Sequence, residues 1–88
     1  MLGWHVYIVE STRGALYTGI TTSVARRYAE HLHGRRGARY FRMDPPRAVV
    51  YAEVAADRAA ALRREAQIKA FPRMRKLALI AAVRACAP

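Results

Sequence analysis

The chain has 88 residues, of which 53% are hydrophobic and 25% are charged. This composition excludes a disordered chain and leaves room for one small domain over residues 1–88, with a core from about 4 to 80. Sixteen basic residues against six acidic ones give a net charge of +10, which predicts a polyanionic partner. A codon preference for arginine explains the excess of arginine over lysine but not the shortage of acids.

The sequence also indicates the cellular compartment in which the protein works. Cys86 is the one cysteine, which excludes an internal disulfide or a CxxC metal site. The N-terminus does not resemble a signal peptide, and the longest apolar run, residues 77–83, is too short to cross a bilayer. We therefore expect a cytoplasmic protein.

Hydrophobic patterning predicts three strands and three helices in the order β-β-α-β-α-α, which is the order of an α+β domain. The strands are expected at residues 4–9, 16–22 and 48–54, and the helices at 23–33, at 57–70 and from 72 onward. Ser23 or Thr22 is expected to cap the first helix and Asp57 the second, while Pro72 separates the second from the third.

The first two strands form a predicted hairpin whose loop decides where two tyrosines point. If Gly14 takes the left-handed position of a three-residue loop, Tyr17 lies opposite Val9 and Tyr7 opposite Gly19. Both hydroxyls then leave the same face of the sheet, because side chains alternate with period two. A two-residue loop would put them on opposite faces, and the glycine favours the longer loop.

The helices carry apolar positions at helical spacing. In the first helix Val24, Tyr28 and Leu32 recur every four residues and predict the buried side, with Arg27 and His31 on an adjacent face. The apolar side of the last helix is expected to consist of Met74, Leu77, Leu79, Ile80 and Val83.

Five side chains and one glycine attract attention for their chemistry. Each of Tyr7 and Tyr17 alone is explained as strand packing, but Gly19 beside them is expected to open space for a nucleophile or a phosphate. Arg27 and His31 form either a solvated helix face or a phosphate clamp. Both interpretations remain open at this point.

Glu65 points toward the apolar side of its helix, between Leu62 and Ile68. A carboxylate in that position needs a partner, because its burial without one is costly. The partner is either one of the many arginines or a divalent cation, and magnesium needs only one or two carboxylates when phosphates and water complete its shell.

The segment from 34 to 47 is a basic loop with embedded aromatic residues. Aromatic stacking combined with phosphate contacts is typical of surfaces that hold unpaired nucleic acid, although a solvated loop has the same composition. The expected nucleic-acid-binding residues are Arg35, Arg36, Arg39, Tyr40 and Arg42.

Taken together, these motifs resemble the GIY-YIG nuclease superfamily, and specifically its small stand-alone bacterial members. The resemblance runs from about Trp4 to Ile80. It rests on Val6-Tyr7-Ile8, Tyr17-Thr18-Gly19, Arg27-x3-His31 and Glu65-x2-Ile68-Lys69, in that order.

The resemblance implies a three-stranded antiparallel sheet flanked by helices, and metal-dependent hydrolysis of phosphodiester bonds in DNA or RNA. By position, Tyr17 would be the general base and Tyr7 its hydrogen-bonding assistant, while Arg27 would stabilise charge on the phosphate. His31 would orient the tyrosine or the phosphate, and Glu65 would bind Mg²⁺ or Mn²⁺. A free tyrosine has a pKa near 10, so this chemistry requires nearby positive charge, from Arg27 or the metal, to lower it.

Two departures from the family pattern accompany the resemblance. His5-Val6-Tyr7 replaces Gly-Ile-Tyr, and the chain has no asparagine, which several larger members use near the end of the domain. A rival hypothesis is a nucleic-acid-binding module with the nuclease fold and little or no turnover, and another is an adaptor whose protein partner supplies specificity. The intact catalytic set favours the nuclease, with structure-selective or non-specific cutting.

Overall fold

The computed structural model describes residues 3–33 and 43–86. Within these ranges the chain forms β1 (Trp4–Ser11), β2 (Leu16–Thr21), α1 (Val24–Leu32), β3 (Pro46–Ala55), α2 (Arg58–Ala70) and α3 (Arg73–Cys86). The strands form one antiparallel sheet in the order β2-β1-β3. The predicted α+β class and the element order β-β-α-β-α-α are confirmed.

The hairpin has the predicted odd loop. Gly14 has a φ of +88°, in the left-handed region that favours glycine, and its N–H donates to the Ser11 carbonyl. Tyr7 pairs with Gly19 across the two strands, and Val9 pairs with Tyr17. The prediction that both tyrosines share a face is therefore confirmed.

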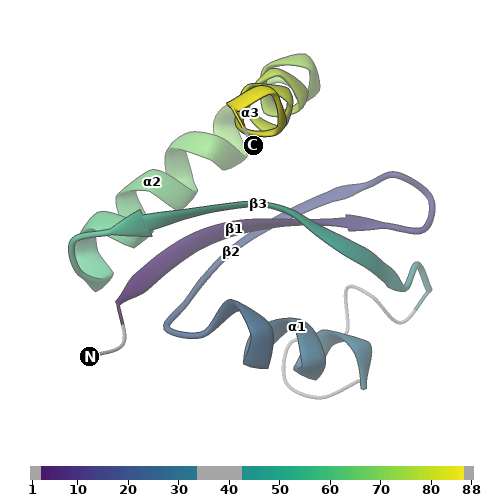
Figure 1. Cartoon of the computed structure of the whole chain (residues 1–88), viewed down its shortest axis with the longest axis horizontal. Helices are drawn as coiled ribbons and strands as arrows, with labels where there is room; N and C mark the ends of the chain where they lie inside the picture. The colour runs from purple at the N-terminus through teal and green to yellow at the C-terminus, as the bar shows by residue number, and fades with distance from the viewer. Residues whose placement is uncertain (1–2, 34–42, 87–88) are drawn as a thin grey trace.

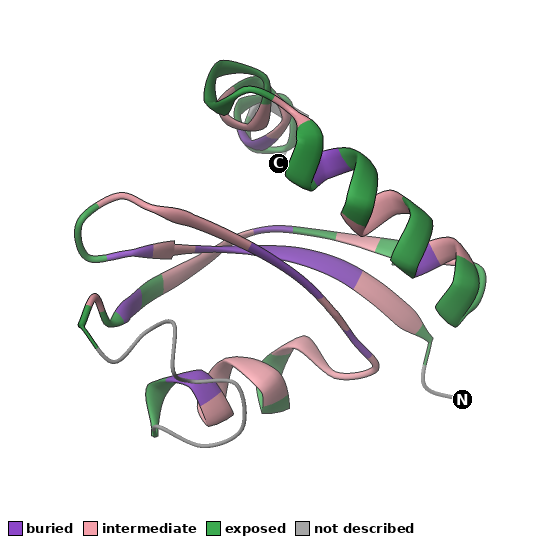
Figure 2. Ribbon diagram, turned by 180° about the vertical axis from the view of Figure 1, so that it is seen from behind, coloured by how far each residue is buried: buried purple, intermediate pink, exposed green. Residues whose placement is uncertain are grey.

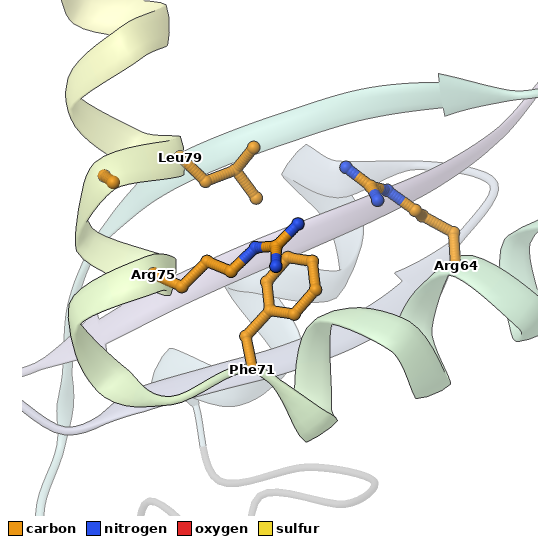
Figure 3. A pocket seen from close by; sticks show the side chains of 5 residues that line it. Arg64, Phe71, Arg75 and Leu79 are labelled. Carbon is orange, nitrogen blue, oxygen red and sulfur yellow. The ribbon is translucent and has the colours of Figure 1, made fainter.

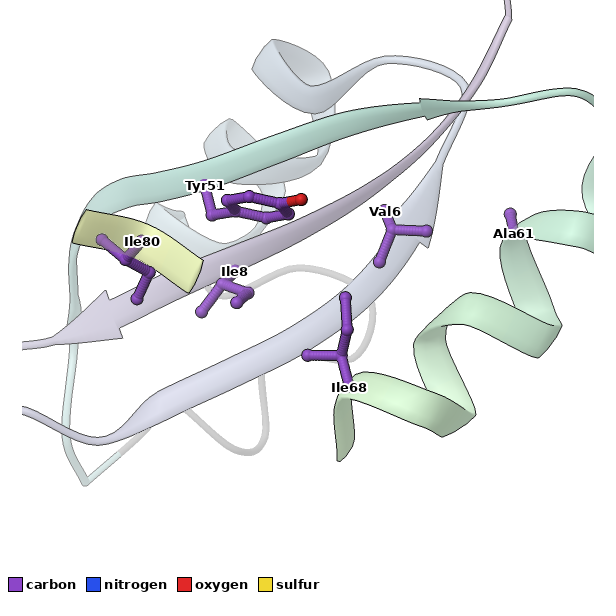
Figure 4. Packing of buried hydrophobic residues seen from close by; sticks show 6 residues of the cluster. All are labelled: Val6, Ile8, Tyr51, Ala61, Ile68 and Ile80. Atoms are coloured by element: carbon purple, nitrogen blue, oxygen red, sulfur yellow. The ribbon is translucent and has the colours of Figure 1, made fainter. Parts of the chain in front are cut away.

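Helices cover both faces of the sheet (Figure 1), with α1 on one side and the pair α2 and α3 on the other. The most buried positions lie on the central strand β1 (Figure 2), where side chains alternate between the two layers. Between the sheet and the α2 and α3 layer lies the larger core (Figure 4), formed by Val6, Ile8, Tyr51, Ala61, Ile68 and Ile80. The α1 side has a smaller cluster, in which Tyr7 and Val9 contact Tyr17, Val24, Tyr28 and Val49.

The helices start where the capping residues predict. Ser23 Oγ accepts a hydrogen bond from the Arg26 N–H at 3.2 Å, and Asp57 Oδ1 accepts one from the Ala60 N–H at 2.8 Å. The Pro72 carbonyl accepts the first backbone hydrogen bond of α3, from the Arg75 N–H at 3.0 Å. In each case the capping group accepts a hydrogen bond from a backbone N–H that has no partner four residues earlier within the helix.

The predicted buried sides of two helices, α1 and α3, were partly wrong. Leu32 is 51% exposed and His31 is 2% exposed. His31 follows Val24 by seven residues, so the two side chains leave the helix within about 20° of the same direction. Leu32 follows Val24 by eight residues and therefore points well away from that direction. In α3, Met74 and Val83 are 76% and 45% exposed. That helix covers the sheet from one side only, so a narrow stripe around Ile80 is buried rather than a wide face.

Asp44 ties the hairpin to the segment that leads into β3. Its carboxylate accepts hydrogen bonds from Ser11 Oγ at 2.5 Å, Thr12 Oγ1 at 2.9 Å and the Arg13 N–H at 3.0 Å. These bonds, that from Ser11 foremost, hold the pKa of Asp44 below its ordinary value. The hairpin tip and the start of β3 are therefore fixed to each other.

No helix within residues 3–33 or 43–86 is long and apolar enough to cross a membrane.

Candidate active site

Three aromatic rings from three elements meet on the α1 side of the sheet. Tyr7 of β1 and Tyr17 of β2 have ring centroids 6.3 Å apart. His31 of α1 lies 6.2 Å from the Tyr7 centroid and 5.3 Å from that of Tyr17, which it meets edge-on. The two sequence motifs and the helix motif are thus brought together by the hairpin register and by the packing of α1.

Gly19 allows Tyr7 to occupy its position. A Cβ on Gly19 would lie 2.7 Å from Tyr7 Oη and 2.8 Å from its Cζ, closer than any carbon atom can approach. The Tyr7 ring therefore lies directly over the glycine. The space that we expected Gly19 to open for a substrate is filled by Tyr7, and this expectation was wrong.

Tyr7 is a protonated hydrogen-bonding group. Its side chain is 1% exposed, and its Oη shares a 3.0 Å hydrogen bond with Nε2 of His31. Burial, with a smaller contribution from Tyr17, raises the pKa of Tyr7 to about 12 although Arg27 acts in the opposite direction. In Tyr7, desolvation outweighs the effect of the Arg27 guanidinium on the pKa.

Tyr17 is the more accessible of the two tyrosines. It lies on β2, an edge strand of the sheet, and is half-buried where Tyr7 is fully buried. A substrate that reaches this surface therefore meets Tyr17 before Tyr7.

His31 is neutral at physiological pH. Burial first, and then the charge of Arg27, lower its pKa below the ordinary 6.5, against a smaller opposing effect of Glu30. A neutral imidazole offers one donor and one acceptor nitrogen, so His31 can bridge Tyr7 to a second group.

Arg27 is held by a residue that sequence reasoning missed. Its Nη1 donates to Glu30 Oε1 at 2.9 Å, and both side chains are 21% exposed. Burial disfavours its charge, but hydrogen bonding to Glu30 and Tyr7 outweighs this and raises the pKa of Arg27. The spacing of three residues on one helix is a signal that could have identified Glu30.

Glu65 approaches from the other layer of the fold. It lies on α2, is 18% exposed and forms an ion pair with Lys69 at 3.4 Å. Its charge is near enough to Tyr7 to contribute, as the smallest effect, to the raised pKa of that phenol. Among residues 3–33 and 43–86, the ionic partner of Glu65 is thus a lysine one turn along its own helix.

The residues fit a divalent cation only in part. Among the described residues no three His, Cys, Asp or Glu side chains gather in a way that would hold a metal ion. A magnesium ion commonly takes one or two carboxylates and completes its shell with water and substrate phosphate. Glu65, a partly exposed carboxylate whose ion pair is weak at 3.4 Å, suits that kind of shared site.

The predicted nucleic-acid-binding set lies outside the described residues. It consists of Arg35, Arg36, Arg39, Tyr40 and Arg42. The neighbouring Arg47 on β3 is exposed and lies 3.9 Å from Glu10.

Comparison with known proteins places this arrangement in a family. Residues 3–76 match the GIY-YIG catalytic domain. A UPF0213 protein of Desulfotalea psychrophila is 48% identical over 79 residues, which cover 90% of this chain and 72% of that protein. A UPF0213 protein of Pseudomonas aeruginosa is 45% identical over 80 residues, with 91% and 76% covered.

A solved structure agrees with the fold. The solution NMR structure of the UPF0213 protein BH0048 from Bacillus halodurans is similar with a TM-score of 0.58 and 35% sequence identity. The similarity covers 91% of this chain and 84% of that one. The chain therefore belongs to the GIY-YIG domain family and, within it, to the small bacterial UPF0213 proteins.

Proposed function

We propose that this protein is a metal-dependent nuclease that hydrolyses phosphodiester bonds in DNA or RNA. The observation that carries the proposal is the cluster of Tyr7, Tyr17 and His31 on one face of the sheet, with Arg27 beside it. The net charge of +10 supports a nucleic-acid substrate, because phosphate backbones are the commonest polyanions that a basic protein meets.

Tyr17 acts as the general base that takes a proton from the attacking water. Its half-buried position at the edge of the sheet supports this role, since the base must reach the water within hydrogen-bond distance. Tyr7 suits this role less well, because burial raises its pKa to about 12 and so stabilises the protonated phenol.

Tyr7 and His31 position the reacting groups, and Arg27 stabilises negative charge. Tyr7 and His31 hold each other through their 3.0 Å hydrogen bond, which fixes the aromatic surface that Tyr17 contacts. Arg27 supplies a permanent positive charge to the phosphate, and a ligand with a stronger negative charge competes with Glu30 for its guanidinium.

Glu65 is the proposed ligand of Mg²⁺ or Mn²⁺. A bound cation would stabilise the negative charge that develops on the phosphoryl oxygens. Because no three His, Cys, Asp or Glu side chains of the described residues gather to hold a cation, a bound ion would complete its shell with water and the substrate phosphate.

The test compares wild-type protein with Tyr17→Phe and Glu65→Gln on labelled single-stranded, double-stranded and branched DNA and on RNA, each with Mg²⁺, with Mn²⁺ and with EDTA. We expect cleavage by wild-type protein only with metal, and a loss of at least about a hundredfold in rate for both variants, since Tyr17→Phe removes the general base and Glu65→Gln removes the charge of the metal ligand. Tyr7→Phe should lose less, because it removes a positioning contact and not the base.

Matched controls separate chemistry from folding. Tyr28→Phe removes a hydroxyl from a half-buried tyrosine of the same cluster. Glu10 lies on β1 and pairs with Leu16, so Glu10→Gln removes a carboxylate whose side chain leaves the face of the sheet opposite that of Tyr17. Both should cleave at the wild-type rate. A wild-type protein that binds all four substrates and cleaves none would instead identify a binding module with the nuclease fold.

A further inference from the structure

A second cavity lies on the opposite side of the sheet from the tyrosine cluster. It has a volume of about 280 Å³ and opens between α2 and α3 (Figure 3). Its walls are formed by Arg64, Phe71, Arg75, Ala78 and Leu79. The volume is just below the range of small-molecule sites, about 300–1,000 Å³, and suits a flat group of modest size.

Arg75 brings an available positive charge to this cavity. Its guanidinium lies 4.3 Å from the centroid of the Phe71 ring, within cation–π distance. No hydrogen bond or ion pair between described residues uses that guanidinium, so its donors are open to a ligand. The residue itself is exposed at the start of α3.

Arg64 faces the same space from α2 and is fixed in place. Its Nε donates to both carboxylate oxygens of Glu53, at 3.1 and 3.2 Å, and its Nη1 donates to Gln67 at 3.0 Å. Glu53 is held in turn by the hydroxyl of the buried Tyr51. This chain of contacts orients the guanidinium 6.0 Å from the Phe71 centroid before any ligand arrives.

We propose that the cavity between α2 and α3 binds one unpaired nucleotide of a nucleic-acid strand, with the base against Phe71 and Leu79 and the phosphate on Arg75. Planar guanidinium groups and aromatic rings are the surfaces on which unpaired bases stack. The ring and the leucine supply the apolar wall for the base, and Arg75 supplies the donors for the phosphate.

The charge of the surrounding helix favours a strand over a free mononucleotide. α3 carries Arg73, Arg75, Lys76 and Arg84 and no acidic residue between its ends at 73 and 86. Positive charges around a stacking pocket attract the phosphates of a backbone, and a strand brings several phosphates where a mononucleotide brings one group. Aspartate and glutamate side chains would use the same charges but offer no flat ring for the cavity.

This binding site is separate from the proposed nuclease site. It lies in the layer of α2 and α3, whereas Tyr17, Arg27 and His31 lie in the layer of α1. Binding there requires neither a metal ion nor the tyrosines. The experiment can therefore be done in EDTA, where its outcome does not depend on whether the protein cleaves its substrate.

The test is an NMR titration of wild-type protein in EDTA with an oligothymidylate of roughly ten nucleotides. The Nε–Hε signals of Arg64 and Arg75 and the ring signals of Phe71 should shift together. Arg75→Ala should weaken binding about tenfold, the scale of one lost stacking and phosphate contact. Arg75→Lys keeps the charge but not the flat guanidinium, and should also bind more weakly than wild type.

Arg84→Ala is the matched control, because it removes one positive charge from the same helix outside the cavity. It should weaken binding by about twofold or less. The proposal is overturned if Arg75→Ala and Arg84→Ala lose the same affinity, or if the three cavity residues do not shift. It is equally overturned if inorganic phosphate alone reproduces the shifts at the same concentration, or if polyglutamate binds as tightly as the oligonucleotide.

Discussion

Replacing Gly19 by alanine tests whether the tyrosine cluster depends on one missing side chain. Among the described glycines the one with a positive φ is Gly14, so the backbone of Gly19 accepts alanine without strain. The new Cβ would nevertheless lie 2.7 Å from Tyr7 Oη and 2.8 Å from Cζ. Tyr7 is 1% exposed and hydrogen-bonded to His31, so its ring has no open direction in which to move.

The expected cost follows from three effects. Overpacking a filled site destabilises a protein by about 1–3 kcal/mol, and loss of the Tyr7 to His31 hydrogen bond adds about 1 kcal/mol. The lower entropy of alanine in the unfolded chain offsets about 0.4–1 kcal/mol. We therefore expect Gly19→Ala to lower the free energy of unfolding by about 2 kcal/mol and Tm by roughly 10 °C.

Urea unfolding followed by circular dichroism measures this cost directly. Gly3→Ala is the control, because a Cβ on Gly3 meets nothing within 4 Å, and it should change the free energy of unfolding by less than about 0.5 kcal/mol. In a Tyr7→Leu background the same Gly19→Ala change should cost much less, since leucine has no atom where the clash occurs. Equal costs for the two glycines, or an equal cost in both backgrounds, would refute the proposed contact.

Two further outcomes are expected from the pKa of His31 and from the larger core. The pKa of His31 is lowered by burial and by Arg27, so the unfolded chain binds the proton more readily than the folded protein. The free energy of unfolding should therefore fall as the pH drops below about 6.5. It should level off once the folded protein is also protonated. Urea unfolding from pH 7.5 to 5 measures this fall, and His31→Gln should reduce it, whereas an unchanged profile would contradict the assignment. Ile68→Ala should lower the free energy of unfolding by about 2–5 kcal/mol in the same assay, because Ile68 is 0% exposed. Leu62→Ala, at a position 38% exposed on the same helix, should cost far less. Equal costs would contradict the packing of α2 on the sheet.

The hairpin could be predicted from sequence because one residue determines its geometry. Gly14 specified the left-handed loop position, and the loop length then fixed which residues face each other along β1 and β2. Capping side chains fixed the helix starts in the same local way, through Ser23 and Asp57. These features depend on neighbours within a few residues, which a sequence displays.

The details of the site could not be predicted because they depend on contacts between layers. A spacing of four residues suggested Leu32 on the buried side of α1, but the true geometry of the helix buries His31 instead. The predicted register already put Tyr7 opposite Gly19, but it did not show that the Tyr7 ring lies over the glycine and fills the space beside it. The ring direction goes with the contact to His31, which belongs to the helix layer and not to the hairpin.

The same register that builds the fold also separates the two tyrosines chemically. By lying over Gly19, the Tyr7 ring is sealed between β2 and α1, and its pKa rises to about 12. The raised pKa disfavours Tyr7 as the proposed base and leaves it as a hydrogen-bonding partner of His31. Tyr17, diagonally across the hairpin on the edge strand, keeps contact with the solvent, as the proposed role of general base requires. The proposed division of roles between two chemically identical side chains therefore follows from which of them has a glycine opposite it.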